Sequence, residues 1–194
     1  MNRLKGIVLG VAFMALPAIA QAQVINFDDA FQDCGYTALP NGYQHFNWDN
    51  VYVITGECNS GPGYTNGVVS SPNVAYNGYG SPADFWSTSP FTFNSVYATS
   101  AWYDDNVVTF SGWLGATPLY TQSFPIVTSG PQLLTFNWGG IDKVEIVTSN
   151  YQAVFDDLTV NGGTVTPEPA TLLLLSTGLV GIGGIMRRRR SKNS

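Results

Sequence analysis

Short apolar runs alternate with turn residues through the middle of the chain. The runs are rich in Val, Ile, Thr and aromatic residues, whereas Gly, Pro, Asn and Ser fill the gaps between them. This pattern favours β-strands, because β-branched and aromatic side chains fit a pleated sheet and Gly and Pro interrupt it. Eight or nine such strands predict an all-β fold, a two-sheet β-sandwich of the jelly-roll kind. The predicted strands span residues 24–27, 51–55, 67–70, 91–102, 107–113, 119–127, 132–138, 143–148 and 153–160.

The N-terminus has the pattern of a Sec-type signal peptide. Arg3 and Lys5 supply a positive start, residues 6–16 are apolar, and Ala20 and Ala22 form a small-x-small site for signal peptidase. An N-terminal membrane helix is the alternative, which the short apolar run and the cleavage site both disfavour. The predicted divisions of the chain are a signal peptide over 1–22, a β-sandwich domain over 23–166 and a C-terminal segment over 167–194.

A second uncharged stretch lies close to the C-terminus. Residues 170–186 contain no charged side chain and are followed by four arginines. A helix of this length measures about 25 Å, near the lower limit for crossing a hydrocarbon core of roughly 30 Å. Arginines are costly to move across a bilayer, so we predict a transmembrane helix with its C-terminal end in the cytoplasm. An ordinary anchor explains the helix and the arginines, but not the Pro-Glu-Pro sequence that precedes them.

Pro-Glu-Pro, a Gly-rich apolar helix and an Arg cluster, in that order at a chain end, resemble the PEP-CTERM sorting signal. The resemblance implies export, transient anchoring in a Gram-negative inner membrane, and processing by an exosortase near Pro-Glu-Pro. It also implies a place at the cell surface or in the extracellular matrix, often in bacteria that make extracellular polysaccharide and biofilm. The residues of the sorting signal are Pro167, Glu168, Pro169, Arg187, Arg188, Arg189 and Arg190.

Charge is distributed unevenly along the chain. The whole chain has a net charge of −5, but seven of its eight basic residues lie in the two terminal segments. Between residues 23 and 166, Lys143 is the only Lys or Arg and faces twelve Asp and Glu. So acidic a domain repels nucleic acid and anionic lipid headgroups, which excludes a nucleic-acid partner.

Cys34 and Cys58 are the two cysteines of the chain. An even number in an exported domain favours a disulfide, because the environment is oxidising. The loop that it would close has about 25 residues and is worth roughly 3 kcal/mol of stability. Free thiols or a redox pair are the alternatives, although a redox pair usually has Cys-x-x-Cys spacing.

Residues 142–146 and 155–160 resemble the closing strands of galactose-binding-like jelly rolls, many of which are carbohydrate-binding modules. The resemblance implies a structural Ca²⁺ between the first and last strands. Asp28 and Asp156 would supply two of its oxygen ligands, and no other cofactor is expected. The alternative is that these are strand-end aspartates that face water.

Groups suited to catalysis are few. The pairs Asp104-Asp105 and Asp156-Asp157 are adjacent in sequence, and adjacent residues of a strand point to opposite faces, so neither pair flanks one substrate from within a strand. A bulge or turn would relax this for Asp104-Asp105, which precedes Asn106 in an expected loop. His45 is the one histidine, and no Gly-x-Ser-x-Gly elbow accompanies it. We therefore predict that the protein is not an enzyme, and a secreted glycoside-acting hydrolase is the least favoured function.

Aromatic side chains are the remaining candidates for a binding site. Tyr79 and Trp86 lie in a loop stretch rich in Gly, Ser and Pro, where a core role is not expected. Trp102 and Tyr103 adjoin the acidic loop Asp104-Asp105-Asn106, a combination that suits stacking on sugars and binding their hydroxyls. Trp113 and Trp138 end apolar strands and are expected to pack within the domain. Two hypotheses remain: a structural or adhesive protein without chemistry of its own, or a carbohydrate-binding module for extracellular polysaccharide.

Overall fold

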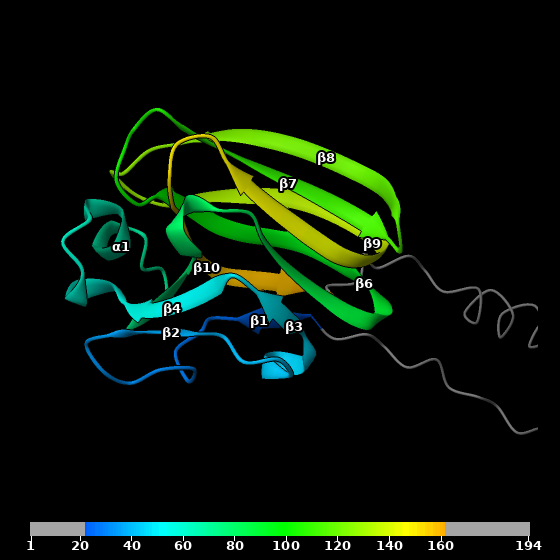
Figure 1. Ribbon diagram of the computed structural model, residues 1–194, viewed down its shortest axis with the longest axis horizontal. Helices are drawn as coiled ribbons and strands as arrows, with labels where there is room; N and C mark the ends of the chain where they lie inside the picture. The colour runs from blue at the N-terminus through cyan, green and yellow to red at the C-terminus, as the bar shows by residue number, and fades with distance from the viewer. Residues whose placement is uncertain (1–21, 162–194) are drawn as a thin grey trace, which may run out of the picture.

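The computed structural model describes residues 22–161 (Figure 1). Ten strands and four short helical turns make up this part, which confirms the all-β prediction. The predicted signal peptide, Ala22 apart, and the predicted sorting segment lie outside the described residues, and no helix within 22–161 is long and apolar enough to cross a membrane. The strands are β1 (Gln23–Ile25), β2 (Tyr36–Ala38), β3 (Asn47–Asp49), β4 (Val51–Thr55), β5 (Asn73–Asn77), β6 (Ala83–Ser100), β7 (Asn106–Leu114), β8 (Thr117–Ile126), β9 (Gln132–Thr148) and β10 (Ala153–Val160). The helical turns are η1 (Tyr43–His45), η2 (Gly56–Cys58), α1 (Pro62–Asn66) and η3 (Gly78–Gly80).

The sandwich has two layers that hydrogen bonds join into one sheet. The strand order is β2-β4-β5-β10-β6-β9-β7-β8, with β1 on β10 and β3 on β6, and every pairing is antiparallel. The long strand β6 pairs with β3 through its first part and with β10 through its last part. The expected two sheets are therefore the two halves of a folded sheet, which Figure 1 shows as layers on either side of β6 and β9.

A bulge allows β6 to serve both layers. Trp86 pairs with Lys143 and Phe91 pairs with Ile141, so five steps along β6 match two along β9. Extra residues in one strand of a pair bend that strand and increase its twist. The bend between Trp86 and Phe91 thus carries β6 from one layer to the other.

Aromatic rings fill the core between the layers. Phe93 is fully buried, and its ring centroid lies 4.5 Å from that of Phe136 and 5.9 Å from that of Phe110. Trp138, 7% exposed, packs at the edge of the same cluster, as predicted. A smaller apolar cluster, centred on Tyr64 and Tyr76, lies on the outer side of β4 and β5, where α1 covers it.

The structure confirms the predicted disulfide. Cys34 and Cys58 are bonded, with their Cα atoms 5.2 Å apart. Cys34 precedes β2 and Cys58 ends η2 directly after β4, so the bond ties together the ends of two neighbouring strands. Because β2 has only three residues and lies at the sheet edge, the disulfide supplies much of its attachment.

Reduction of this bond is expected to lower the free energy of unfolding by about 3 kcal/mol, the value for a closed loop of this length. Urea unfolding with and without dithiothreitol measures the difference. The Cys34→Ser/Cys58→Ser double variant should match the reduced protein and be insensitive to dithiothreitol. Equal stability of the oxidised and reduced proteins would contradict the expected contribution.

Candidate functional site

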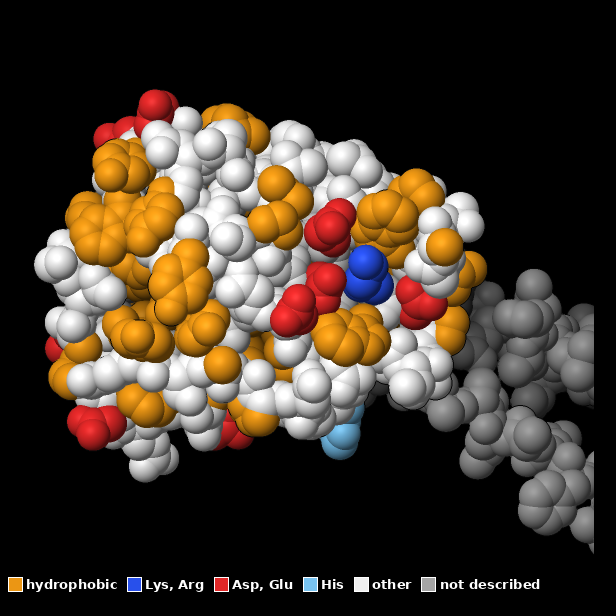
Figure 2. Space-filling model, viewed as in Figure 1, with side chains coloured by type: hydrophobic (Ala, Val, Ile, Leu, Met, Phe, Trp, Pro, Cys, Tyr) orange, Lys and Arg blue, Asp and Glu red, His pale blue; other side chains and the backbone are white. Residues whose placement is uncertain are grey.

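A groove lined mainly by tyrosines opens on the outer side of the β2-β4-β5 edge. It has a volume of about 220 Å³ and is built from β2, β4 and β5, from η3 and α1, and from the segments after η2, after β6 and before β10. In Figure 2, orange side chains gather at the end of the molecule where Figure 1 places α1. We call this the tyrosine groove, and its lining residues are Tyr36, Tyr52, Asn59, Tyr64, Tyr76, Gly78, Tyr79, Trp102, Tyr151 and Gln152.

The rings of the groove contact one another in a continuous series. The ring centroid of Tyr52 is 5.8 Å from that of Tyr76, which is 5.3 Å from that of Tyr64. Tyr64 in turn lies 6.0 Å from Trp102, and Trp102 lies 6.4 Å from Tyr151. Edge-to-face and offset pairs at such distances are favourable beyond the area that they bury. The groove is therefore an aromatic surface whose rings hold one another in place.

Two of the tyrosines have backbone conformations that large residues rarely adopt. Tyr79 has a φ of 57° and Tyr151 a φ of 64°, both in the left-handed region. Such a conformation costs of order 1–3 kcal/mol for a bulky residue and persists where the surrounding structure requires it. Tyr79 is 70% exposed and Tyr151 44% exposed. The strained backbone therefore holds two tyrosine rings at the surface, where they contribute little to the core. Strained residues that expose their side chains in this way are typical of binding sites.

One amide supplies polar groups on the floor of the groove. Gln152 Oε1 accepts hydrogen bonds from the Tyr64 hydroxyl and from the Trp102 indole N–H, each at 2.8 Å. Indole nitrogen only donates, so these bonds fix the orientation of the amide. The Gln152 Nε2 then points away from both donors and has no acceptor among residues 22–161. Burial raises the pKa of Tyr64 above its ordinary value, so its hydroxyl stays protonated and acts as a donor.

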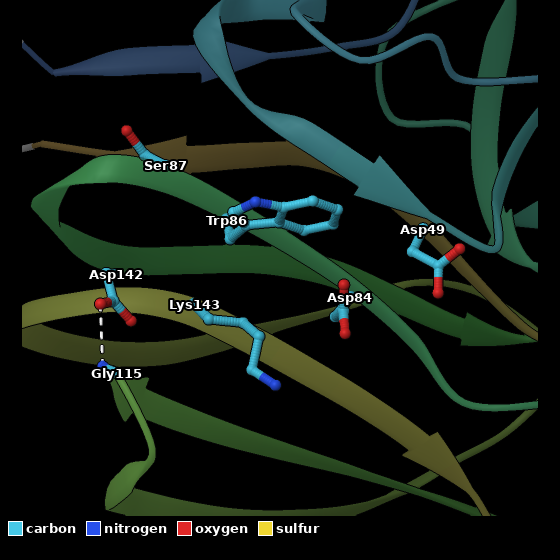
Figure 3. Close-up of a pocket in the computed structure, with 7 residues that line it drawn as sticks. All are labelled: Asp49, Asp84, Trp86, Ser87, Gly115, Asp142 and Lys143. Atoms are coloured by element: carbon cyan, nitrogen blue, oxygen red, sulfur yellow. Dashed lines mark hydrogen bonds between the residues drawn. The ribbon is translucent and has the colours of Figure 1, made fainter.

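A second pocket lies on the outer face of β3, β6 and β9. It has a volume of about 430 Å³ and is lined by Trp86 and Lys143 together with three aspartates, Ser87 and Gly115. In Figure 3 the Trp86 ring extends toward Asp49, and Lys143 lies beside it on the adjacent strand. Asp142 accepts a hydrogen bond of 2.8 Å from the backbone N–H of Gly115. We call this the Lys143 pocket.

The Lys143 pocket contains one cation among three carboxylates. The Lys143 ammonium lies 5.0 Å from the centroid of the Trp113 ring, a cation–π distance. Burial raises the pKa of the Asp84 carboxyl, Lys143 opposes that rise, and the negative charges of Asp49 and Glu145 add to it. The pocket therefore combines carboxylates, which accept hydrogen bonds, with the Lys143 ammonium, which donates them, and an aromatic ring. These are the groups that bind polyols.

The structure places the predicted sugar-binding residues in different surroundings. Trp86 lines the Lys143 pocket and Trp102 lines the tyrosine groove. Tyr103 is 51% exposed but lines neither of them. Tyr79, expected with Trp86 in a loop outside the core, is exposed in the tyrosine groove, whereas Trp86 lies in β6. Tyr151 and the rest of the groove were missed, although Tyr151 follows Ser-Asn, a context that indicates a loop.

The acidic loop beside Trp102 braces neighbouring loops. Asp104 Oδ1 accepts hydrogen bonds from the backbone N–H and the hydroxyl of Thr128, at 2.8 and 2.7 Å, and these bonds lower the pKa of Asp104. Asp105 Oδ1 accepts one of 2.7 Å from the Asn150 side chain. These bonds use one oxygen of each carboxylate. His45 is exposed in η1 and lines neither of the two pockets.

The two aspartates of the calcium hypothesis bind protein donors. Asp28 accepts hydrogen bonds from the Asn73 backbone N–H at 3.0 Å and the Asn26 side chain at 2.8 Å. Asp156 is fully buried and accepts from the backbone N–H groups of Val69 and Ser70. Neither belongs to a group of three or more His, Cys, Asp or Glu placed to hold a metal within residues 22–161. The Ca²⁺ site stays a prediction, which the effect of a chelator on the melting temperature tests.

Residues 165–190 match the PEP-CTERM protein-sorting motif. The chain carries a PEP-CTERM sorting motif. The match covers the predicted Pro-Glu-Pro sequence, the apolar stretch and the arginines, so the expected resemblance is confirmed at that end of the chain. The motif marks a protein that is exported, anchored transiently in the membrane and processed by an exosortase.

Solved structures similar to this chain include two carbohydrate-binding modules. TmCBM61, solved in complex with β-1,4-galactotriose, is 5% identical, with 64% of this chain and 95% of that chain covered and a TM-score of 0.37. The CBM32 of AlyQ, solved in complex with 4,5-unsaturated mannuronic acid, is 17% identical, with 45% and 75% covered and a TM-score of 0.32. No curated protein matches the sequence.

Proposed function

We propose that this protein acts at the cell surface or in the extracellular matrix as a non-catalytic, adhesive module that binds neutral polysaccharide in the tyrosine groove. The observation that carries this proposal is the strained, exposed placement of Tyr79 and Tyr151 beside Trp102. The C–H faces of sugar rings are apolar and weakly positive, so they stack on the negative faces of aromatic rings. The amides of Asn59 and Gln152 can bind sugar hydroxyls at the same time.

The charge of the domain supports a neutral ligand. Residues 22–161 contain one Lys or Arg, which is Lys143, and twelve Asp and Glu. A field of this sign repels polyanions such as polyuronates and nucleic acids, while neutral chains feel no such barrier. The exosortase and signal peptidase handle the terminal segments of the chain, and polysaccharide is the partner proposed for the domain.

Substitution of groove residues provides the test. Tyr79→Ala and Trp102→Ala should each weaken binding roughly tenfold to a hundredfold, because a buried aromatic contact is worth about 1.5–3 kcal/mol. The full-length protein is applied to an array of neutral and acidic glycans, and affinities for the glycans that bind are measured by calorimetry. Tyr103→Ala is the matched control, since it removes a tyrosine of similar exposure outside the groove. No binding to any glycan, or equal losses for Tyr103→Ala, would reject the proposal.

A further inference from the structure

The tyrosine groove and the Lys143 pocket lie along the same two-stranded ribbon. β3 and β4 follow one another with a single residue between them, and β3 pairs with the first part of β6 while β4 pairs with β5. Residues 78–82, which include η3, loop out of the partner chain between these two pairings. The β3–β4 side of the ribbon therefore runs from one pocket to the other, with a shift of register at Asn50. Along it the cross-strand partners are Asn47 and Trp86, Asp49 and Asp84, and Tyr52 and Tyr76.

An extra residue keeps the side chains of both pockets on the outer face of the ribbon. Trp48 and Val51 both point into the core, although simple alternation would place them on opposite faces. Asn50, with a φ of 53°, lies between them and restores the alternation. As a result Asp49 and Tyr52 both face outward, one in each pocket.

The same asparagine fixes the chain that joins the pockets. Asn50 Nδ2 donates hydrogen bonds to the carbonyl oxygens of Gly78 at 3.0 Å and Pro82 at 2.9 Å. These bonds hold η3, which carries Tyr79, against the ribbon at the point between the pockets. In Figure 2 one face shows the orange groups at the α1 end and, further along, the one blue side chain, Lys143, surrounded by red carboxylates.

We propose that the two pockets are the ends of one extended site that binds an internal stretch of a neutral polysaccharide chain. Trp86 stacks on a sugar ring at one end, the tyrosine groove holds rings at the other, and Asp49 and Asp84 accept hydroxyl hydrogen bonds between them. The β3–β4 chain extends about 17 Å from Asn47, which pairs with Trp86, to Tyr52. This distance is longer than one monosaccharide. This inference rests on the proposed function and extends it from a single groove to a chain-binding surface.

A chain-length series tests the extended site. Cello-, manno- and galacto-oligosaccharides of two, four and six residues are titrated into the full-length protein by calorimetry. In the series that binds, affinity should rise tenfold or more from the dimer to the hexamer. Trp86→Ala should lower hexamer affinity to that of the dimer, whereas Tyr79→Ala should weaken the binding of both. Trp86 is half-buried on the outer face, so its truncation leaves the core intact, and circular dichroism checks the fold.

The outcomes separate the two proposals. Equal affinities for dimer and hexamer, with Tyr79→Ala still weakening both, overturn the extended site and leave the tyrosine groove as the binding site. Hexamer binding that is unaffected by Trp86→Ala overturns it in the same way. If the unmodified protein binds none of these oligosaccharides and no glycan on the array, the proposed function fails and the extended site fails with it.

Discussion

The protein is expected to lose stability as the pH rises from about 4 to 7, and Asp156 is the reason. Burial raises the pKa of this carboxyl to about 7, although hydrogen bonds from Val69, Ser70 and Asp157 act in the opposite direction. In the unfolded chain the same carboxyl has a pKa of about 3.9. Between these pH values the folded protein binds one proton more than the unfolded chain. The free energy of unfolding is therefore greatest below about pH 4 and falls as the pH rises to about 7.

The size of this effect is set by the pKa difference. Three pKa units correspond to about 4 kcal/mol, which is a large share of the stability of a single domain. Asp156→Asn cannot ionise, so the difference in unfolding free energy between pH 5 and pH 8 should shrink by about 2.5 kcal/mol, because roughly two of the three units lie above pH 5. The variant should also be less stable at pH 5, because its amide can accept for only one of the two pairs of donors that face the carboxylate.

Urea unfolding of the wild type and Asp156→Asn at pH 5 and pH 8 measures both effects. Glu57→Gln is the control for net charge, because it removes one negative charge from an exposed position. That variant should keep the pH dependence of the wild type. A wild-type protein equally stable at pH 5 and pH 8, or a dependence that persists in Asp156→Asn, would show that another group is responsible.

The contacts of Asp156 also explain why one predicted strand does not form. Residues 67–70 were predicted as a strand because of their two valines, but this segment is a loop. The backbone N–H groups of Val69 and Ser70 donate to Asp156, 87 and 86 residues away, in place of a neighbouring strand. The strand that does form, β5, was missed, because its flanking Asn73 and Asn77 are typical of turns. Both are fully buried, and Asn73 Nδ2 donates to the Phe27 and Phe31 carbonyls.

The sequence pattern predicted a strand correctly where a single apolar run forms a single strand. β4 and β10 have the predicted bounds, since their runs of β-branched residues end at clear turn residues. Residues 132–138 and 143–148 were predicted as two strands, yet β9 continues through Gly139 and Gly140, because Gly140 takes a φ of 74° and forms an irregularity inside the strand. The register with β6 shifts near this point, and only the pairing of two long strands determines that.

The candidate site was predictable in part. Trp86 and Trp102 were found from their loop-like surroundings, and each lines a pocket. Tyr52, Tyr64 and Tyr76 look like ordinary residues of a strand or turn, and they meet because β4 pairs with β5 while α1 folds over both. The bond from Tyr64 to Gln152 spans 88 positions, and no local pattern indicates it.

Replacing Gly63 with alanine should both destabilise the domain and abolish glycan binding. Gly63 lies in α1 where the helix meets the end of β6, and its N–H donates to the Ala101 carbonyl at 3.1 Å. A Cβ atom here would overlap the carbonyl oxygen of Ser100 and lie 2.9 Å from Ala101 Cα. Both are backbone atoms, so α1 itself must move. Alanine favours helix by about 1 kcal/mol over glycine, but overpacking costs about 3 kcal/mol and outweighs that gain.

Movement of α1 reaches the tyrosine groove through Tyr64. This side chain follows Gly63 directly, contacts the rings of Tyr76 and Trp102, and bonds to Gln152. Gly130→Ala is the matched control, because a Cβ at that position meets no atom within 4 Å. It should change the unfolding free energy by no more than about 0.5 kcal/mol and leave binding intact. Thermal unfolding and calorimetry on the two variants therefore distinguish a groove that depends on α1 from one that does not: a Gly63→Ala protein that binds glycan as the wild type does would show that the rings hold their places without the helix.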